Sequence, residues 1–306
     1  MIERGSTMGK IVVIGSINMD FTAVLSKLPV VGETLLAQDF KMSGGGKGAN
    51  QAMAAAIFSD NVKMIGMVGD DIAGHALIEK MQEKGVDVSC VEFCDDNTGT
   101  ALINVDANGR NTIVVYPGAN HKLTPEIVRK YKDVIEEADL VMMQLEIPLE
   151  TVKEAADIAY AAHVPVLLNP SPAQKLDDDL LNKITYLTPN ETELLRLANA
   201  LETFKGALTL RERGVKNVIV TLGSKGCYVK TDDMDMRVAS YKVNAIDTTA
   251  AGDSFSGALA ANIAKGVDLS LALKKANATG ALTTTKVGAQ EALPTKEEVE
   301  HLIISQ

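Results

Sequence analysis

The stretch Lys10-Ile11-Val12-Val13-Ile14-Gly15 is a continuous apolar run that ends in glycine. Such a run is typical of a strand buried on both faces in a parallel sheet. Similar short apolar runs recur at 62–68, 140–145, 164–168, 184–187 and 218–222. Helical patterns separate most of them, at 49–58, 72–84, 125–137, 149–162 and 191–197. This alternation predicts an α/β fold with a mostly parallel sheet and helices on both faces.

Two regions interrupt the alternation. Residues 17–25 and 33–42 have the patterns of short strands around a turn, and 98–106 and 111–116 flank Ala107-Asn108-Gly109-Arg110. Asn-Gly between two β-rich runs is a strong hairpin signal. We therefore expect a small separate β-sheet, formed by segments 17–42 and 98–116, inserted into one α/β domain that spans the chain. One face of this sheet has no partner in the core, so it should cover a site or a second subunit.

Composition narrows the classes of function. The chain has 306 residues, 46% of them hydrophobic, and a formal net charge of −10, so a basic nucleic-acid face and attraction to an anionic membrane are not expected. The three cysteines form no zinc set, and their low, odd number fits a reducing cytoplasm. No apolar run is long enough for a membrane span. Residues 1–8 are expected to be a leader or a tag outside the ordered domain.

The segment Asp247-Thr248-Thr249-Ala250-Ala251-Gly252-Asp253 opens an Ala-rich helical pattern. A helix N-terminus attracts anions through its unpaired N–H groups, and small residues let an anion approach the backbone. A carboxylate at Asp253 would face that anion, an arrangement that suits a base beside a phosphate. Taken alone, Asp253 could equally be a helix stabiliser in the first turn.

A glycine-rich loop, Ser43-Gly44-Gly45-Gly46-Lys47-Gly48-Ala49-Asn50-Gln51, precedes another Ala-rich helix. A flexible turn is the simplest interpretation. A P-loop is excluded because Lys47 is not followed by Ser or Thr. The loop matches G-x-G-x-x-A, but a dinucleotide fingerprint should follow the first strand of the fold, which ends at Gly15.

A polyol site fits the same loop better. Asn18 and Asp20 follow the first predicted strand at i and i+2, so their side chains share one face of an extended segment. Together with the loop amides, Lys47 and Asn50, they offer the mixture of donors and acceptors that sugar hydroxyls need. Asn-x-Asp alone is more often a turn.

Seven motifs in this order resemble the ribokinase-like (PfkB-type) carbohydrate kinases, from about Lys10 to the C-terminus. They begin at Gly15, Gly45, Met143, Thr188, Thr221, Asp247 and Lys286 and read GSINMD, GGKGANQA, MQLE, TPNETE, TLGSKG, DTTAAGDSF and KVGAQ. The resemblance implies a three-layer α/β/α sandwich with a small β-sheet lid. It also implies transfer of the γ-phosphate of ATP to the 5-hydroxyl of D-ribose, with Mg²⁺ and K⁺ as cofactors.

The resemblance also implies roles for individual residues. Asp253 would be the base, with the amides of Ala250, Ala251 and Gly252 around the transferred phosphoryl group. The residues that would hold the sugar are Asn18, Asp20, Gly46, Lys47, Gly48, Ala49, Asn50, Glu146 and Asp253. Those that would line the nucleotide channel are Asn190, Glu193, Thr221, Leu222, Gly223, Ser224, Lys225, Gly226, Gly252 and Asn277, with Glu193 acting on the magnesium water shell. The positions around potassium would be Asp247, Thr249, Thr283, Lys286, Gly288 and Ala292, mostly through backbone carbonyls.

Several alternatives remain open from the sequence. Within the kinases they are 2-deoxyribose, fructose, 2-keto-3-deoxygluconate or a nucleoside as acceptor. Outside them are an NAD-linked oxidoreductase that uses Gly44–Ala49 and a catalytically silent sugar or nucleotide sensor. The resemblance further implies a homodimer through the lid, and we expect no nucleic-acid or membrane partner.

Overall fold

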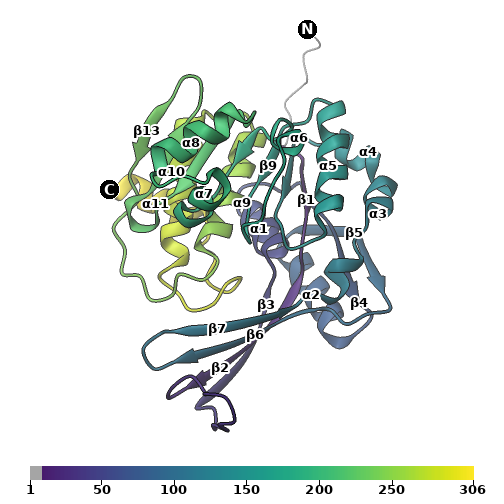
Figure 1. Ribbon diagram of the computed structural model, residues 1–306, viewed down its shortest axis with the longest axis vertical. Helices are drawn as coiled ribbons and strands as arrows, with labels where there is room; N and C mark the ends of the chain where they lie inside the picture. Colours follow the sequence, from purple (N-terminus) through teal and green to yellow (C-terminus); the bar gives the residue numbers. More distant parts are fainter. Residues whose placement is uncertain (1–8) are drawn as a thin grey trace.

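The computed structural model describes residues 9–306 (Figure 1), so residues 1–8, interpreted above as a leader or a tag, lie outside it. A nine-stranded sheet runs through the body in the order β13-β12-β11-β10-β9-β8-β1-β4-β5. Its strands are β1 (Ile11–Ile14), β4 (Val62–Gly69), β5 (Val86–Cys94), β8 (Leu140–Met143), β9 (Val166–Leu168), β10 (Tyr186–Leu187), β11 (Asn217–Thr221), β12 (Cys227–Lys230) and β13 (Asp235–Val238). Neighbours from β5 to β11 run parallel, and β12 and β13 are antiparallel.

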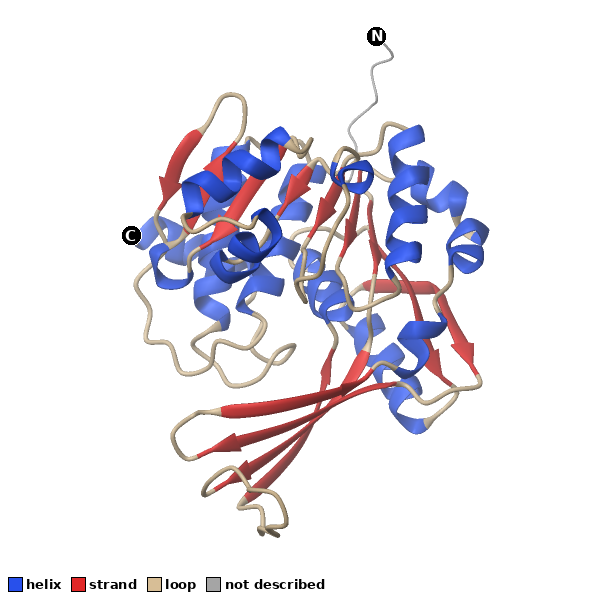
Figure 2. Ribbon diagram, in the orientation of Figure 1, coloured by secondary structure: helices blue, strands red, loops and turns tan. Residues whose placement is uncertain are grey.

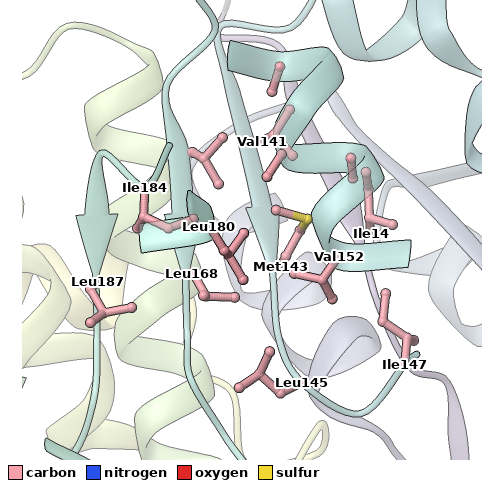
Figure 3. Packing of buried hydrophobic residues seen from close by; sticks show 14 of the residues in the cluster. Ile14, Val141, Met143, Leu145, Ile147, Val152, Leu168, Leu180, Ile184 and Leu187 are labelled. Carbon is pink, nitrogen blue, oxygen red and sulfur yellow. The ribbon is translucent and has the colours of Figure 1, made fainter. Parts of the chain in front are cut away.

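Successive residues of β1 face two different hydrophobic cores, which explains the unbroken apolar run. Val12 and Ile14 pack in one cluster, whereas Ile11 and Val13 pack in the other, on the opposite face of the sheet. Figure 3 shows the first cluster, where Ile14 lies near Met143 of β8 and Val152 of a covering helix. The predicted α/β sandwich is therefore confirmed.

Helices cover each face of this sheet (Figure 2). The helices with residues in the Ile14 cluster are α3 (Pro125–Lys130), α4 (Lys132–Glu136), α5 (Leu149–Ala161), α6 (Asp178–Leu181), α7 (Glu191–Ala198) and α8 (Thr203–Glu212). Those with residues in the other cluster are α1 (Lys47–Ala56), α2 (Ile72–Glu83), α9 (Ala251–Ala264), α10 (Leu269–Thr283) and α11 (Lys296–Ser305). No helix of residues 9–306 is long and apolar enough to cross a membrane.

A second sheet projects from the body (Figures 1 and 2). Its strands are β2 (Asn18–Leu25), β3 (Asp39–Gly45), β6 (Gly99–Asp106) and β7 (Asn111–Tyr116), in the order β3-β2-β6-β7. The predicted hairpin around Asn108-Gly109 joins β6 to β7. The separate four-stranded sheet predicted from the sequence is thus present.

Some elements differ from the sequence prediction. β5 was not expected, because its buried and exposed residues alternate from Val86 to Cys90 instead of forming an apolar run. The helical pattern at 125–137 is two helices, which meet at Tyr131. The strand predicted at 33–42 is β3, which begins only at Asp39. Helix α8 was also missed.

The position of β1 determines where a ligand can bind. β1 lies between β4 and β8, so the chain fills one side of β1 with β4 and β5 and later the other side with β8 to β11. This is a topological switch point, and in open α/β sheets the crevice at such a point, beyond the carboxyl ends of the strands, is the usual ligand site.

Candidate active site

A cavity of about 200 Å³ opens at the carboxyl ends of the central strands. Its lining combines residues that follow β9, β10 and β11 with the N-terminal turns of α1 and α9. The lining residues are Lys47, Asn169, Ser171, Thr188, Asn190, Glu193, Thr221, Thr248, Ala250, Ala251, Gly252 and Asp253. Two larger hollows, of about 610 and 550 Å³, lie around Asp70 and around Arg213 and contain none of the predicted site residues.

Asp253 lies in the first turn of α9 and is only 6% exposed. Its carboxylate accepts two hydrogen bonds from side-chain amides of α1: Asn50 Nδ2 at 3.1 Å and Gln51 Nε2 at 2.9 Å. Asp253 makes no side-chain cap at this N-terminus, although its charge in the first turn still favours the helix dipole. Its two hydrogen bonds to α1 show that the carboxylate is also held by another element.

The backbone before Asp253 is shaped to receive an anion. Ala250 adopts a left-handed conformation with φ 57°, which is uncommon for a residue with a Cβ atom. Ala251 N–H donates to the Thr248 carbonyl at 3.3 Å, whereas the N–H groups of Ala250, Gly252 and Asp253 have no hydrogen-bond partner in the described chain. A Cβ atom on Gly252 would meet nothing within 4 Å, so open space adjoins these N–H groups.

Asn18 and Asp20 start β2, directly beside the end of β1. Asn120, in the 3₁₀ turn Gly118–Lys122, donates from Nδ2 to Asn18 Oδ1 at 2.7 Å and accepts from the Ile17 N–H at 2.8 Å. The side-chain oxygen of Asn18 therefore already accepts a hydrogen bond, and its side-chain NH₂ group remains to donate to a ligand. Asn120 was not singled out from the sequence.

The carboxylate of Asp20 is partly buried and lies against the backbone of Gly45. Burial is the main cause that raises the pKa of Asp20 to about 7, and the nearby carboxylates of Glu146, Glu291 and Asp253 add to the effect. No hydrogen bond from a donor in residues 9–306 reaches this carboxylate. It is a desolvated acceptor that lacks the donors it needs.

Glu146 lies just past β8 and anchors the start of α1. Its Oε2 atom accepts from Ser16 Oγ at 2.6 Å and from the Lys47 N–H at 3.0 Å. The Lys47 side chain lines the cavity, where the Asp253 carboxylate raises its pKa against the opposing effect of burial, with Glu146 and Glu193 contributing further. The cavity lining therefore includes a protonated ammonium group.

The glycine loop does not have the geometry of a dinucleotide fingerprint. Gly44 and Gly45 end β3, an antiparallel strand of the small sheet, and Gly46 leads directly into α1. Gly46 has φ 83°, and a Cβ atom there would lie 2.7 Å from the Asn18 nitrogen. Gly48 and Ala49 are buried next to Ser16, whose carbonyl accepts from the Ala49 N–H at 2.9 Å. The loop thus packs against the segment that carries Asn18 and Asp20.

On the nucleotide side, Asn190 and Glu193 form a reciprocal capping box at α7, with both hydrogen bonds at 2.8 Å. The box does not use Asn190 Nδ2 or Glu193 Oε1, so the two residues can cap the helix and contact a ligand at the same time. A bridge pairs Asn190 with Thr221 at the end of β11. These three residues line the same cavity as Asp253.

The rest of the predicted nucleotide segment lies outside that cavity. Gly223–Lys225 forms a 3₁₀ turn between β11 and β12, where Ser224 is exposed and Leu222 packs on the core. Gly226 has φ 89°, and a Cβ atom there would overlap the Val238 carbonyl. Asn277 is 4% exposed, and its Nδ2 contacts the carbonyls of Val238 and Ala239 at 3.3 Å. Asn277 therefore holds the segment after β13.

Of the residues predicted around potassium, Thr249 and Gly288 contact Asp247. Its carboxylate accepts from Thr249 N–H at 2.9 Å, Thr249 Oγ1 at 2.6 Å and Gly288 N–H at 2.9 Å. Burial alone would raise the pKa of Asp247, but these hydrogen bonds outweigh it and lower the pKa below its usual range. No ion pair from a Lys, Arg or His in the described chain neutralises it.

The other predicted positions leave backbone oxygens as the available ligands. Thr283 Oγ1 donates to the Thr279 carbonyl at 2.9 Å, and Lys286 Nζ donates to Glu298 at 3.2 Å. Ala292 is fully buried. One anionic carboxylate among carbonyls fits a monovalent cation, whereas within residues 9–306 no cluster of three His, Cys, Asp or Glu side chains could hold a metal ion.

Sequence reasoning missed four buried amide residues around Asp253: Gln51, Gln144, Asn169 and Gln290. Three of them had weak signals. Gln144 and Asn169 each directly follow an apolar strand, as Ser16 and Thr188 nearly do, and Gln51 follows Asn50 in the glycine loop. A polar residue at the end of each parallel strand indicates a site at the switch point.

Comparisons with known proteins agree with this geometry. Residues 8–296 match the model of the pfkB family of carbohydrate kinases. The chain is 40% identical to a ribokinase of Bacillus subtilis (strain 168), with 97% of this chain and 100% of the relative covered. It is 38% identical to a deoxyribokinase of Salmonella typhi, with 97% and 99% covered. A solved structure of Arabidopsis thaliana ribokinase complexed with ribose and ATP superposes with a TM-score of 0.90 at 31% identity, covering 96% of this chain and 98% of that one. The chain belongs to the pfkB family of carbohydrate kinases.

Proposed function

We propose that this kinase transfers the γ-phosphate of ATP to the 5-hydroxyl of D-ribose, which gives D-ribose 5-phosphate and ADP. One observation carries the proposal: Asp253 lies between a side-chain cluster suited to hydroxyls and a helix N-terminus suited to phosphate. The relatedness to ribokinases over nearly the whole chain supports it.

Asp253 is the general base in this reaction. Its carboxylate takes the proton of the 5-hydroxyl as the hydroxyl oxygen bonds to the γ-phosphorus and the bond from that phosphorus to the β-phosphate oxygen breaks. The N–H groups of Gly252 and Asp253 and the ammonium group of Lys47 stabilise the charge of the phosphoryl group in transit. The remaining contribution is positioning, because an alcohol and a phosphate held in line need little further chemistry.

Two cations belong to the proposal. Glu193 keeps its Oε1 atom, which would accept from the water shell of a Mg²⁺ ion on the nucleotide phosphates, and Asn190 keeps its Nδ2 group, which would donate to a phosphate oxygen. Bound Mg²⁺ would supply charge neutralisation at the phosphates. Asp247 and the carbonyls of Thr249, Thr283, Lys286, Gly288 and Ala292 would hold K⁺. This loop runs into the N-terminus of α9, so it fixes the shape of the backbone around Ala250.

D-ribose is favoured over 2-deoxyribose by Asp20. A buried acceptor without donors is costly, and a substrate hydroxyl removes that cost only if it is present. An analogue with one hydroxyl fewer gives this polar cluster one donor fewer. The relatedness to a deoxyribokinase makes 2-deoxyribose the second candidate.

The projecting sheet is proposed to be a lid of the single kinase domain and a homodimer interface. Its register places Phe21, Met42, Leu102 and Val114 in one row across all four strands, on the face opposite Asp20. The last three are each at least half exposed. A second lid would cover this row, and a Leu102→Asp variant is expected to be monomeric by sedimentation. A cytoplasmic location stays a prediction, supported by three free cysteines.

The function is tested by ADP release with Mg-ATP, in potassium or sodium buffer, with D-ribose, 2-deoxyribose, fructose or adenosine. Ribose-dependent turnover that exceeds turnover of the other acceptors supports the proposal. Preference for 2-deoxyribose would move the substrate to the second candidate. No turnover on any acceptor would favour a sensor.

A further inference from the structure

Two glutamines, Gln144 and Gln290, are buried behind Asp253 without touching it. Gln144 directly follows β8 and is 0% exposed; Gln290 lies in the loop between α10 and α11 and is 2% exposed. Both contact α1, the helix that carries the two amides bound to Asp253. The proposed reaction gives neither glutamine a substrate contact.

Each outer glutamine donates to one inner amide. Gln144 Nε2 donates to Gln51 Oε1 at 2.6 Å, and Gln51 Nε2 in turn donates to Asp253 Oδ1 at 2.9 Å. Gln290 Nε2 donates to Asn50 Oδ1 at 3.2 Å, and Asn50 Nδ2 donates to Asp253 Oδ2 at 3.1 Å. Two parallel relays thus end on the two oxygens of one carboxylate.

The direction of these hydrogen bonds matters because an amide can bind in two orientations. Turned over, Gln51 or Asn50 would present its oxygen to the carboxylate and lose its donor there. A donor fixed behind each inner amide oxygen excludes that orientation. Asn169 Oδ1 adds a second constraint on Gln51, since it accepts from the same Nε2 atom at 3.2 Å.

Both outer glutamines leave a buried oxygen unsatisfied. Gln144 Oε1 and Gln290 Oε1 have no hydrogen-bond partner in the described chain. They lie against Gly15 and Gly44, where a Cβ atom would overlap them. Each outer glutamine thus offsets the hydrogen bond that it donates to an inner amide with a buried oxygen of its own that costs stability. The net contribution of these two side chains to stability is therefore small and does not by itself account for glutamine at either position.

We propose that Gln144 and Gln290 are positioning residues, which orient Gln51 and Asn50 so that both amides hold the Asp253 carboxylate in the direction of the acceptor hydroxyl. The proposal rests on the assignment of Asp253 as the base. Neither relay includes a charged side chain other than Asp253. The charged groups nearby, which act on one another and on Asp253, are Lys47, Asp20, Glu146 and Glu193.

The two relays differ in what they should affect. Gln51 is not among the proposed sugar contacts, so loss of Gln144 should lower kcat and leave KM for sugar and for ATP near the wild-type values. Asn50 is a proposed sugar contact, so loss of Gln290 should lower kcat and also raise KM for the sugar. Neither change should alter KM for ATP.

The test compares Gln144→Leu, Gln290→Leu and the control Asn262→Leu in the full chain. Asn262 is equally buried on α9 but only bonds the Ala258 carbonyl within its own helix, at 2.8 Å. We expect kcat to fall about 10- to 100-fold in the two glutamine variants, the scale of a small misplacement of a reacting group. Each glutamine variant removes one unsatisfied oxygen but leaves an inner amide oxygen without its donor, so its melting temperature should stay near that of the wild type, and the control should keep its kcat.

A kcat of Gln144→Leu within twofold of the wild type would overturn the proposal, as would an equal fall in the control. Crystal structures of the variants give a readout that does not depend on turnover. We expect the Gln51 contact with Asp253 to be lost in Gln144→Leu, and an unchanged contact would also overturn the proposal. If the wild type phosphorylates no sugar, the proposed function fails by itself, and the crystal structures still decide whether the glutamines orient the amides.

Discussion

The proposed sugar side and the proposed phosphate side of this site differ in the groups they offer. On the sugar side these groups are side chains: Asn18 and Asp20 of β2, Asn50 of α1 and Glu146, which follows β8. On the phosphate side they are mainly backbone N–H groups at the start of α9, beside open space at Gly252. A sugar is recognised by many fixed directions, whereas a phosphate needs positive potential and close approach.

Asp253 belongs to both sides, so its substitution should have the largest effect. In Asp253→Asn the base is lost, and we expect kcat to fall about 10³-fold. Ribose and ATP should still bind, because the other contacts on both sides are intact. Single-turnover quench kinetics together with calorimetric binding separates the two results. A folded variant with near-normal kcat would show that Asp253 is not the base.

A pair of glycine substitutions sharpens the contrast between the two sides. Gly252→Ala adds a Cβ atom that meets no protein atom, so the fold should keep its melting temperature while kcat/KM for ATP falls about 100-fold. Gly46→Ala adds a Cβ atom 2.7 Å from the Asn18 nitrogen at φ 83°. It should instead destabilise the fold by about 2 kcal/mol or more.

Differential scanning calorimetry and initial rates on the two variants, measured side by side, check this expectation. The contrast fails if Gly252→Ala unfolds at a lower temperature than Gly46→Ala. It also fails if Gly252→Ala keeps its activity, since that would mean no ligand approaches this backbone.

Asp20→Asn tests whether the Asp20 carboxylate destabilises the protein when no sugar is bound. Burial and neighbouring carboxylates raise the pKa of Asp20 to about 7 in the folded chain, so the folded state binds more protons than the unfolded state between about pH 4 and 7. Wild-type stability therefore falls as pH rises through this window. The ligand-free variant should be more stable than the wild type by about 1–2 kcal/mol at pH 8 and by nothing near pH 4.

The same substitution should weaken ribose binding about tenfold or more, which urea unfolding and calorimetry at both pH values would detect alongside the stability change. If the variant gains no stability at pH 8, the carboxylate is not strained in the empty site. If ribose affinity is unchanged, Asp20 does not contact the sugar.

The smallest expected effect concerns the cation loop. Asp247→Asn removes the negative charge, so stimulation by potassium over sodium should disappear while the activity in sodium buffer remains. We expect a change of about fivefold to tenfold in kcat/KM, the lower range of typical coupling between sites. The potassium-dependent rise in melting temperature should vanish too. A variant that still responds to potassium would place the cation elsewhere.

The sequence alone was enough for the layers of the fold, because apolar runs and helical patterns record burial directly. It was not enough for β5, whose alternating residues face solvent on one side. Within the site, Asn18, Asp20, Glu146 and Asp253 could be identified because charged or turn-forming residues stood in recognisable motifs. Gln144 and Gln290 stand in such motifs too, but they were not singled out, because a buried amide carries no charge and its partner, such as Asn50 for Gln290, is 240 residues away.

The root of the projecting sheet has a kinetic consequence. β2 begins at Asn18, its neighbour β6 begins at Gly99, and Asn120 fastens this point through Ile17 and Asn18. Two proposed sugar contacts, Asn18 and Asp20, therefore lie at the start of a strand of the proposed lid. If the sheet moves as a lid, sugar release and opening of the sheet would be one event, and the dwell time of the product would equal the lifetime of the closed state. In a dimer joined through the outer faces of two such sheets, closure of one sheet would change the lifetime of the closed state of the other.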